Sequence, residues 1–293
     1  MITIILQGGL GNQMFQYAAA KALAVKWNTV VQQDLSIFKI HQHKSWCRPY
    51  ELDVFDIEAT KRFSTSFLNK MWLTLINQYG QNTLVKLLKR KSRVFDSSIS
   101  TMEDWKSCSD NTILIGYFGT ELYFKEYRTE ILKDFQFKTP LDERNETVAN
   151  QMKATNSVSV HIRRGDYLNE VNSKVFAQVS PEWYNRAIQK VQASKGATHF
   201  FFFSDDIEWC RSVFSEIENA VFVDWNHGSD SYRDMQLMSF CKHNIIPNST
   251  FSWWGAWLNN NPDKMVIAPS VFFVDAGKNG AYRQNMPKEW LLM

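Results

Sequence analysis

The stretch best suited to chemistry is His161-Ile162-Arg163-Arg164-Gly165-Asp166-Tyr167, which follows the apolar run Val158-Ser159-Val160. An arginine keeps its charge at any working pH and presents planar pairs of donors that match phosphate oxygens. Two arginines directly after a buried strand therefore predict a site for a diphosphate. The alternative is an exposed turn in which Asp166 neutralises its own arginines.

Four further segments combine a strand end with a polar helix start. Their residues are Gln7-Gly8-Gly9-Leu10-Gly11-Asn12-Gln13-Met14, Phe203-Ser204-Asp205-Asp206, Asp230-Ser231-Tyr232-Arg233-Asp234 and Asn248-Ser249-Thr250-Phe251-Ser252-Trp253-Trp254. Glycines let backbone N–H groups approach a ligand, and a helix N-terminus favours an anion. Each segment also has a structural explanation: a plain turn for the glycines, and helix capping for Asp205 or Asp206 and for the hydroxyl group.

Strands alternate with helices along the chain. We predict strands at residues 2–6, 29–32, 112–115, 158–161, 199–204, 220–223, 244–246 and 265–268. We predict helices at residues 12–27, 181–193, 207–214, 232–241 and 251–260. Short apolar strands separated by helices are typical of parallel sheets covered on both faces, that is, an α/β class. In such sheets ligands bind beyond the carboxyl ends of the strands, where all five polar segments fall.

The length of 293 residues suits two domains, and the polar stretch of residues 138–150 predicts their boundary. We expect an N-terminal domain of residues 1–145 and a C-terminal domain of residues 146–293, facing each other across a cleft. The chain starts with a strand-like run and has no long apolar segment, so we expect neither a signal peptide nor a membrane span. The four cysteines are widely spaced, which favours a reduced, cytoplasmic protein.

The net charge of +3 hides a basic first third: residues 1–100 hold 13 Lys and Arg against 6 Asp and Glu. The segment from Lys86 to Arg93 is the most basic part, with leucines interleaved. This pattern suits helices lying on an anionic membrane surface, or ordinary amphipathic helices packed on the core. Because the remainder is acidic and contains no recognised nucleic-acid-binding module, we expect no nucleic-acid partner.

Taken in order, the glycine turn, the His161 to Tyr167 turn, the Phe-rich strand ending at Asp205-Asp206 and the Asn248 to Gly255 segment resemble the α-1,2-fucosyltransferases of glycosyltransferase family eleven. The resemblance spans nearly the whole chain and is closer to the bacterial members than to the membrane-anchored animal ones. It implies a GT-B-like fold of two doubly wound, Rossmann-like domains. The N-terminal domain would serve the acceptor and the C-terminal domain would bind GDP-β-L-fucose.

The same resemblance implies an inverting transfer of L-fucose to the 2-hydroxyl of a terminal β-galactoside, with no metal and no cofactor beyond the donor substrate. Alternatives are another hydroxyl or acceptor, or a non-catalytic nucleotide-sugar binding protein. By analogy, the donor would contact the residues Gly11, Asn12, Gln13, His161, Arg163, Asp205, Asp234, Ser249, Thr250, Phe251 and Ser252. Arg163 would hold the diphosphate and Asp234 would accept from the guanine edge. Asp166 is a candidate general base, or else orients Arg163 or Arg164.

Overall fold

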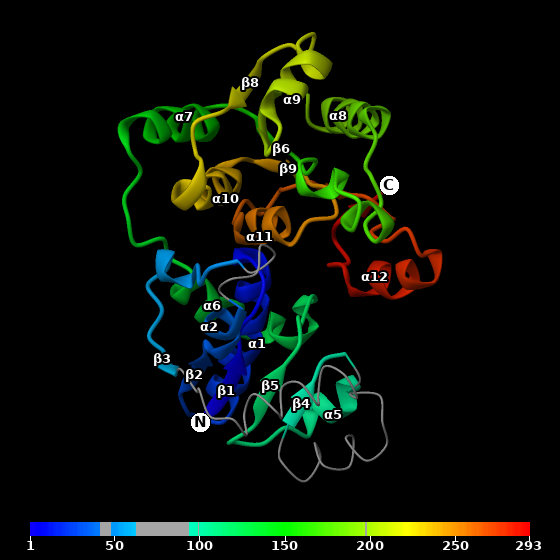
Figure 1. Ribbon diagram of the computed structural model, residues 1–293. Coiled ribbons are helices and arrows are strands. Elements are labelled where there is room, and N and C mark those ends of the chain that lie inside the picture. Colours follow the sequence, from blue (N-terminus) through cyan, green and yellow to red (C-terminus); the bar gives the residue numbers. More distant parts are fainter. Residues whose placement is uncertain (42–47, 63–93, 99, 197) are drawn as a thin grey trace. The chain divides into compact units, whose positions relative to one another are not determined.

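The computed structural model describes residues 1–41, 48–62, 94–98, 100–196 and 198–293. They form two compact α/β units, Met1–Lys138 and Thr139–Met293 (Figure 1). The units divide between Lys138 and Thr139, whereas the predicted boundary after residue 145 falls inside a helix of the second unit. The basic segment from Lys86 to Arg93 lies outside the described residues, so both interpretations of it stay open.

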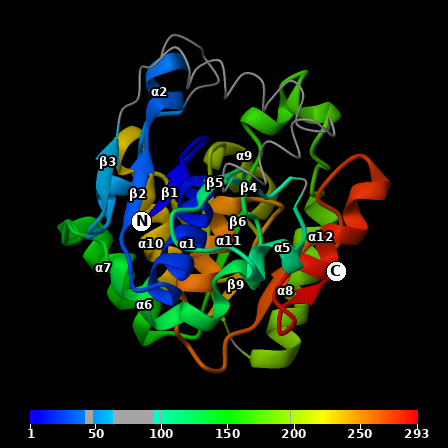
Figure 2. The same ribbon diagram turned by 90° about the horizontal axis from the view of Figure 1, so that it is seen from below.

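The first unit is built on a five-stranded parallel sheet in the order β3-β2-β1-β5-β4, which Figure 2 shows side by side. Its strands are β1 (Ile2–Ile5), β2 (Val31–Asp34), β3 (Thr60–Arg62), β4 (Val94–Asp96) and β5 (Ile113–Ile115). Its helices include α1 (Leu10–Lys26), α2 (Ser36–His41), α5 (Met102–Lys106) and α6 (Arg128–Asp134). The order reverses beside β1, so the loop after β1 lies at the switch point where such sheets bind ligands.

The second unit is built on a six-stranded parallel sheet in the order β11-β10-β9-β6-β7-β8. Its strands are β6 (Ser157–Ile162), β7 (His199–Ser204), β8 (Ala220–Val223), β9 (His243–Ile245), β10 (Val266–Ala268) and β11 (Leu291–Leu292). Its helices include α7 (Glu143–Ala154), α8 (Pro181–Lys195), α9 (Ile207–Phe214), α10 (Tyr232–Phe240), α11 (Thr250–Leu258) and α12 (Asn279–Asn285). Here the order reverses at β6, which pairs with β7 on one side and β9 on the other.

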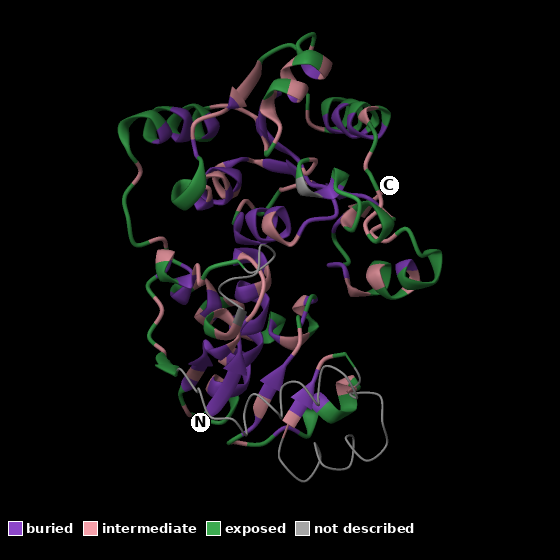
Figure 3. Cartoon of the chain, in the orientation of Figure 1, coloured by how far each residue is buried: buried purple, intermediate pink, exposed green. Residues whose placement is uncertain are grey.

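The four phenylalanines of β7 show how both faces of this sheet are filled. Side chains alternate across a strand, so Phe200 and Phe202 point to one face while Phe201 and Phe203 point to the other. The first pair packs with side chains of α8 and α9, and the second pair packs with those of α7 and α10. All four are fully buried, and in Figure 3 the inner strands β6 and β9 are buried, whereas the edge strand β8 is mostly of intermediate exposure. The sheet is therefore covered on both sides, as predicted for a doubly wound fold.

All eight predicted strands and all five predicted helices are present, with ends that differ by at most two residues. The polar stretch of residues 138–150, predicted to hold the domain boundary, begins at the division between the units and also contains most of α7. The side chain of Asp142 accepts from the backbone N–H of Asn145 and so begins this helix. Cys108, Cys210 and Cys241 are buried and free. Within the ranges given above, no helix is long and apolar enough to cross a membrane.

Candidate functional site

The candidate site lies at the carboxyl edge of the second sheet, where the ends of β6, β7 and β9 are neighbours. The register pairs Ile162 with Ser204, and Val160 with Ile245. The residues that follow these strands therefore emerge side by side. The sequence separates them by about 40 residues at each step, and the sheet brings them together, as we predicted from the strand ends.

Arg163 is held at this edge by Asp205. Its Nη1 lies 3.3 Å from Asp205 Oδ2, and both side chains keep about a quarter of their surface exposed. Asp205 Oδ1 also accepts from the backbone N–H of Arg164 at 2.9 Å. Burial acts to raise the pKa of Asp205, but the Arg163 charge and the N–H groups of Gly165 and Arg164 outweigh it and lower that pKa. Asp205 is thus an ionised clamp on the turn that carries Arg163.

Arg164 forms an ion pair with a different carboxylate, that of Asp206. Its Nε donates to Asp206 Oδ2 at 3.0 Å, and its guanidinium lies over the Trp209 ring at 4.3 Å. Asp206 Oδ1 also accepts from the backbone N–H of Trp209 and so caps α9. The two acids therefore have different roles. Asp206 caps α9, and Asp205 holds the turn that carries Arg163. Of the two arginines, Arg163 is the one whose charge acts on His161.

Gly165 permits this close approach. A Cβ atom at Gly165 would lie 3.0 Å from Asp205 Oδ2 and 3.2 Å from its Cγ. Asp166 begins a short 3-10 helix, Asp166–Leu168, but its side chain is outside what the structure describes. Its predicted role as a base or as an orienting group therefore stays a prediction, while Asp205 and Asp206 are the acids seen to orient the arginines.

His161 lies at the end of β6 and is almost completely buried. Burial, helped by the Arg163 charge, lowers the pKa of His161 to about 3, so the imidazole is neutral at physiological pH. Its ring lies 5.8 Å from that of Phe251, the second residue of α11. Among the described residues its Nδ1 has no hydrogen-bond partner. A buried, neutral ring with an unused nitrogen is available to a ligand at this edge.

The turn after β6 is tied to the segment after β9 by Tyr167. The Tyr167 hydroxyl donates to the Asn248 carbonyl at 2.7 Å, and its ring stacks on Phe176 at 4.8 Å. The Asn248 amide donates to the carbonyls of Ala177 and Phe272, at 2.9 Å each. These contacts fix the start of α11 beside the Arg163 turn.

The N-terminus of α11 is open to an anion. Ser249 is its N-cap but makes no side-chain capping bond, and no acidic residue occupies the first turn. Ser252 is fully buried, and its hydroxyl points to the Ser249 carbonyl at 3.5 Å. Thr250 and Phe251 are half-buried. The N-terminal N–H groups and hydroxyls of Ser249 and Thr250 are therefore better placed for a phosphate than the Ser252 hydroxyl is.

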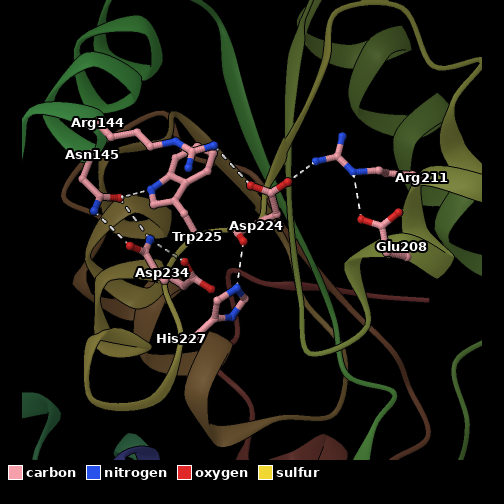
Figure 4. A network of polar contacts seen from close by, with 9 residues as sticks. Arg144, Asn145, Glu208, Arg211, Asp224, Trp225, His227 and Asp234 are labelled. Atoms are coloured by element: carbon pink, nitrogen blue, oxygen red, sulfur yellow. Dashed lines mark hydrogen bonds and ion pairs between the residues drawn. The ribbon is translucent and has the colours of Figure 1, made fainter.

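Asp234 lies in the first turn of α10, after β8. Burial raises its pKa to about 7, against the effect of a hydrogen bond from Asn226 to its Oδ1 at 2.8 Å. Figure 4 shows the polar network around it, which includes Asn145 and Trp225. The sequence did not single out Asn145 or Asn226, because an asparagine in a helix start or a loop is ordinarily a turn former. Neither asparagine lies at a distance from Asp234 in the sequence that would indicate a contact with it.

In the first unit, the Gln13 side chain bonds to the backbone of two neighbouring segments, and its contact with the donor stays a prediction. Its amide nitrogen donates to the carbonyls of Gly8 at 2.7 Å and Pro49 at 2.8 Å, and its oxygen accepts from the N–H of Glu51 at 2.9 Å. Gly8 has φ +79°, and a Cβ there would meet Asn12 Nδ2 at 2.7 Å, so the turn needs glycine. Gln13 thus holds the shape of the glycine turn, with Gly11 buried and Asn12 half-buried beside it.

Two charged groups flank the glycine turn and were not predicted from the sequence. A Cβ atom at Gly9 would lie 3.6 Å from Arg48 Nε and 3.6 Å from Glu51 Oε2. Burial raises the pKa of Glu51, while the Arg48 charge and the backbone N–H of Leu10 act to lower it. Among the described residues the buried Glu51 Oε2 has no hydrogen-bond partner. A carboxyl group of the protein therefore lies beside the start of α1, where the sequence suggested an anion site.

Residues 1–292 match the family model of glycosyl transferase family 11. Among curated relatives, an alpha-1,2-colitosyltransferase of Escherichia coli is 33% identical over 92% of this chain and 91% of its own length. The O-antigen biosynthesis glycosyltransferase WbnK of Escherichia coli is 34% identical over 94% and 95%. The mouse galactoside 2-alpha-L-fucosyltransferase Sec1 is 28% identical over 88% of this chain and 64% of its own length.

Solved structures with a similar fold include the fucosyltransferase NodZ from Bradyrhizobium. It has a TM-score of 0.57 and 14% identity, and covers 87% of this chain and 92% of its own. This likeness confirms the predicted α/β, GT-B-like class. The family match and the relatives confirm that the protein is a glycosyltransferase, as the resemblance of four segments and their order implied. The chain belongs to glycosyl transferase family 11.

Proposed function

We propose that this protein transfers L-fucose from GDP-β-L-fucose to the 2-hydroxyl of a terminal β-galactoside, with inversion and without a metal ion. The observation that carries the proposal is the fixed guanidinium of Arg163 beside the open N-terminus of α11. The family match supports the class of reaction, and the names of relatives such as mouse Sec1 support the galactoside 2-hydroxyl.

The chemistry requires positive charge where the sugar departs. Cleavage of the bond between fucose C1 and the β-phosphate oxygen leaves negative charge on GDP and positive charge on the sugar. Arg163 would stabilise the departing diphosphate, and the N–H groups at the start of α11 would share that charge. The acceptor oxygen forms the new bond from the opposite face and loses its proton, with Asp166 as one candidate base. A pH–rate profile of Asp166→Asn tests that role.

The remaining predicted contacts follow the strand ends. Asp234 would accept from guanine beyond β8, while Ser249, Thr250 and Phe251 would lie along the phosphates beyond β9. His161 would contact the donor between them, beyond β6. Gly11 and Asn12 of the first unit stay predicted donor contacts. The residues from Lys86 to Arg93 stay a predicted contact with anionic membrane at the inner face of a bacterial cell.

The central experiment is product analysis after incubation with GDP-fucose and lactose, or with a galactose-terminated disaccharide. We expect fucose linked α-1,2 to galactose. We also expect turnover to persist in chelator, because Arg163 supplies the charge. Loss of turnover in EDTA that is restored by magnesium or manganese would overturn the metal-independent proposal. Release of no GDP from donor and acceptor would instead indicate a nucleotide-sugar binding protein.

A second donor is supported by the relative named as an alpha-1,2-colitosyltransferase. Colitose is fucose without the 3-hydroxyl, so both sugars have the same ring configuration and differ by one polar group. Parallel reactions with GDP-fucose and GDP-colitose decide between them. A site built to hydrogen-bond the 3-hydroxyl rejects the deoxy sugar strongly, whereas a site that ignores it accepts both.

A further inference from the structure

Two buried asparagines form a reciprocal amide pair between α7 and the loop after β8. Asn145 Nδ2 donates to Asn226 Oδ1 at 2.9 Å, and Asn226 Nδ2 donates back to Asn145 Oδ1 at 3.0 Å. Asn145 is 1% exposed and Asn226 is 7% exposed. Rotating either amide by half a turn would set oxygen against oxygen and nitrogen against nitrogen, so the pair fixes the orientation of both.

The outer contacts of Asn145 lock the pair in place. Its amide nitrogen also donates to Asp142 Oδ2 at 2.6 Å, and its oxygen also accepts from Trp225 Nε1 at 2.9 Å. An asparagine side chain has two donor hydrogens and an oxygen with two lone pairs. All four positions of Asn145 are therefore filled by the protein, so its task is structural. Figure 4 shows how Asn145, Trp225 and Asp234 converge.

Through a hydrogen bond, the oriented amide of Asn226 also holds Asp234. The second amide hydrogen of Asn226 goes to Asp234 Oδ1 at 2.8 Å. Within the described ranges no donor to Asp234 Oδ2 is found, and the side chain is only half-buried. One carboxylate oxygen is thus tied to the protein, and the other is left for a ligand.

We propose that Asn226, locked by Asn145, is a positioning residue that aims the Asp234 carboxylate at the base of the donor nucleotide and makes the site select guanine. The inference rests on the proposed function, with GDP-β-L-fucose as donor. Guanine presents two adjacent donors, N1–H and the 2-amino group, to a carboxylate held in this way. Adenine presents the acceptor N1 on the same edge, which an ionised carboxylate repels.

The location of the pair agrees with the length of the nucleotide. β8 and β6 are separated by β7 in the sheet, so their ends lie about 10 Å apart. A nucleoside diphosphate spans a distance of this order between its base and its second phosphate. A diphosphate at the Arg163 turn therefore places the base near the segment that carries Asn226 and Asp234.

The charged groups on α7, α9, α10 and the loop after β8 contact partners other than Asp234. Asp142 accepts from Asn145, Arg144 and Arg211 form ion pairs with Asp224, and Glu208 forms one with Arg211. Arg233 donates to the Thr139 carbonyl and to Gln236, His227 contacts the Asp224 carbonyl, and Asp230 is exposed. The donor to the Asp234 carboxylate is the Asn226 amide. Its hydrogen bond lowers the Asp234 pKa, while burial raises it to about 7.

A dependence on pH follows, with a definite sign. Guanine donors need the ionised carboxylate, so guanine binding is full above the Asp234 pKa and weakens as the pH falls through it. Removing Asn226 takes away the contact that favours ionisation, so the pKa rises and the weakening begins at a higher pH. A substitution that merely loosened the structure would weaken binding by the same factor at every pH.

The experiment measures the ratio of the ADP and GDP dissociation constants by calorimetry between pH 5.5 and pH 8.5, for the full chain and for Asn226→Ala. Both nucleotides carry the same titrating phosphate, so their ratio isolates the base. In the wild type we expect the preference for GDP to fall as the pH drops through about 7. In Asn226→Ala we expect the fall to begin at a higher pH, with about tenfold less preference at pH 7.

Two further measurements keep the test decisive. His227→Gln removes a nearby titratable ring and should leave the profile unchanged, while Asn226→Ser serves if the alanine variant fails to fold. An Asn226 variant that keeps the wild-type ratio at every pH, or loses it equally at every pH, overturns the positioning role even if fucose transfer continues. A wild type that binds no GDP overturns the proposed function itself, and the inference with it.

Discussion

Two helices begin at the switch points of two similar sheets, yet their N-termini are used differently. At α1 the buried Glu51 carboxyl lies beside the glycine turn, and the Gln13 amide donates to the carbonyls of Gly8 and Pro49. At α11 the N-cap Ser249 makes no side-chain capping bond and no acid lies in the first turn. The first end has a carboxyl group of the protein beside it, whereas the second has neither a side-chain cap nor an acid and is the end at which we propose that the phosphates bind.

The surroundings agree with this difference. Beside α11 the guanidinium of Arg163 is aimed by Asp205, an acid whose pKa is lowered. Beside α1 the carboxyl of Glu51 is buried and its pKa is raised. A strand followed by a polar, glycine-rich or hydroxyl-rich helix start thus occurs in two different electrostatic settings. Which of the two suits a phosphate depends on whether another part of the chain brings an acid or a base to the helix end.

The largest expected effect comes from Arg163→Lys. An ammonium cannot reproduce the two-pronged grip of a guanidinium, and one preorganised charge of this kind is worth roughly 3 to 4 kcal/mol of barrier. We expect kcat/KM to fall about a hundred- to thousand-fold while circular dichroism and melting stay near the wild type. The matched control is Arg164→Lys, whose partners are Asp206 and Trp209; it should lose much less. Near-normal turnover by folded Arg163→Lys would refute the assignment.

The second prediction concerns the turn that carries Arg163. In Gly165→Ala the new methyl group would lie 3.0 Å from Asp205 Oδ2, so the clamp or the turn must shift. We expect about tenfold lower kcat/KM, because a displaced charge stabilises the leaving group less well. Gly280→Ala is the control, since a Cβ there meets nothing within 4 Å. Equal activity of both variants would show that the clamp tolerates displacement.

The sequence predicts the elements that carry the site better than it predicts the contacts within it. The four consecutive phenylalanines predict a strand that is buried on both faces, and the structure confirms this strand as β7. β3 (Thr60–Arg62) was missed because it is an exposed, polar edge strand of three residues. α7 was missed because its first turns are polar and only four of its residues are buried.

Within the site, sequence order could not assign Asp205 and Asp206 to different partners. Adjacent residues on a turn point in different directions, and which acid reaches the arginine turn depends on the neighbouring strand. Arg48 and Glu51 lie some 40 residues from the glycine turn that they flank, so no local pattern links them to it. The amide pair of Asn145 and Asn226 is missed for the same reason.

The third prediction addresses the start of α1. Glu51→Ala removes the carboxyl group beside the Leu10 N–H, which should cost about 1 to 2 kcal/mol and lower the melting temperature. Its affinity for GDP should change less than twofold, because we expect the phosphates to bind at α11. In the wild type the raised pKa means that the folded state binds the Glu51 proton more tightly than the unfolded state. This group therefore favours folding at acid pH and loses that contribution as the pH rises through its folded pKa, and Glu51→Gln should remove the dependence. A large loss of GDP affinity in Glu51→Ala would contradict the comparison.

The smallest expected effect tests the open helix end. Ser249→Ala removes a hydroxyl that makes no capping bond, so melting should shift little, while GDP binding should weaken about fivefold for one lost hydrogen bond. Thr101 is the matched control, because it caps α5 in the first unit with a complete capping box shared with Asp104. Thr101→Ala should cost about 1 kcal/mol of stability and leave GDP affinity unchanged. We thus expect opposite results from the two variants: Thr101→Ala lowers stability and keeps GDP affinity, whereas Ser249→Ala keeps stability and lowers GDP affinity. If Ser249→Ala lowered stability without weakening GDP binding, the α11 end would be an ordinary cap and its difference from α1 would disappear.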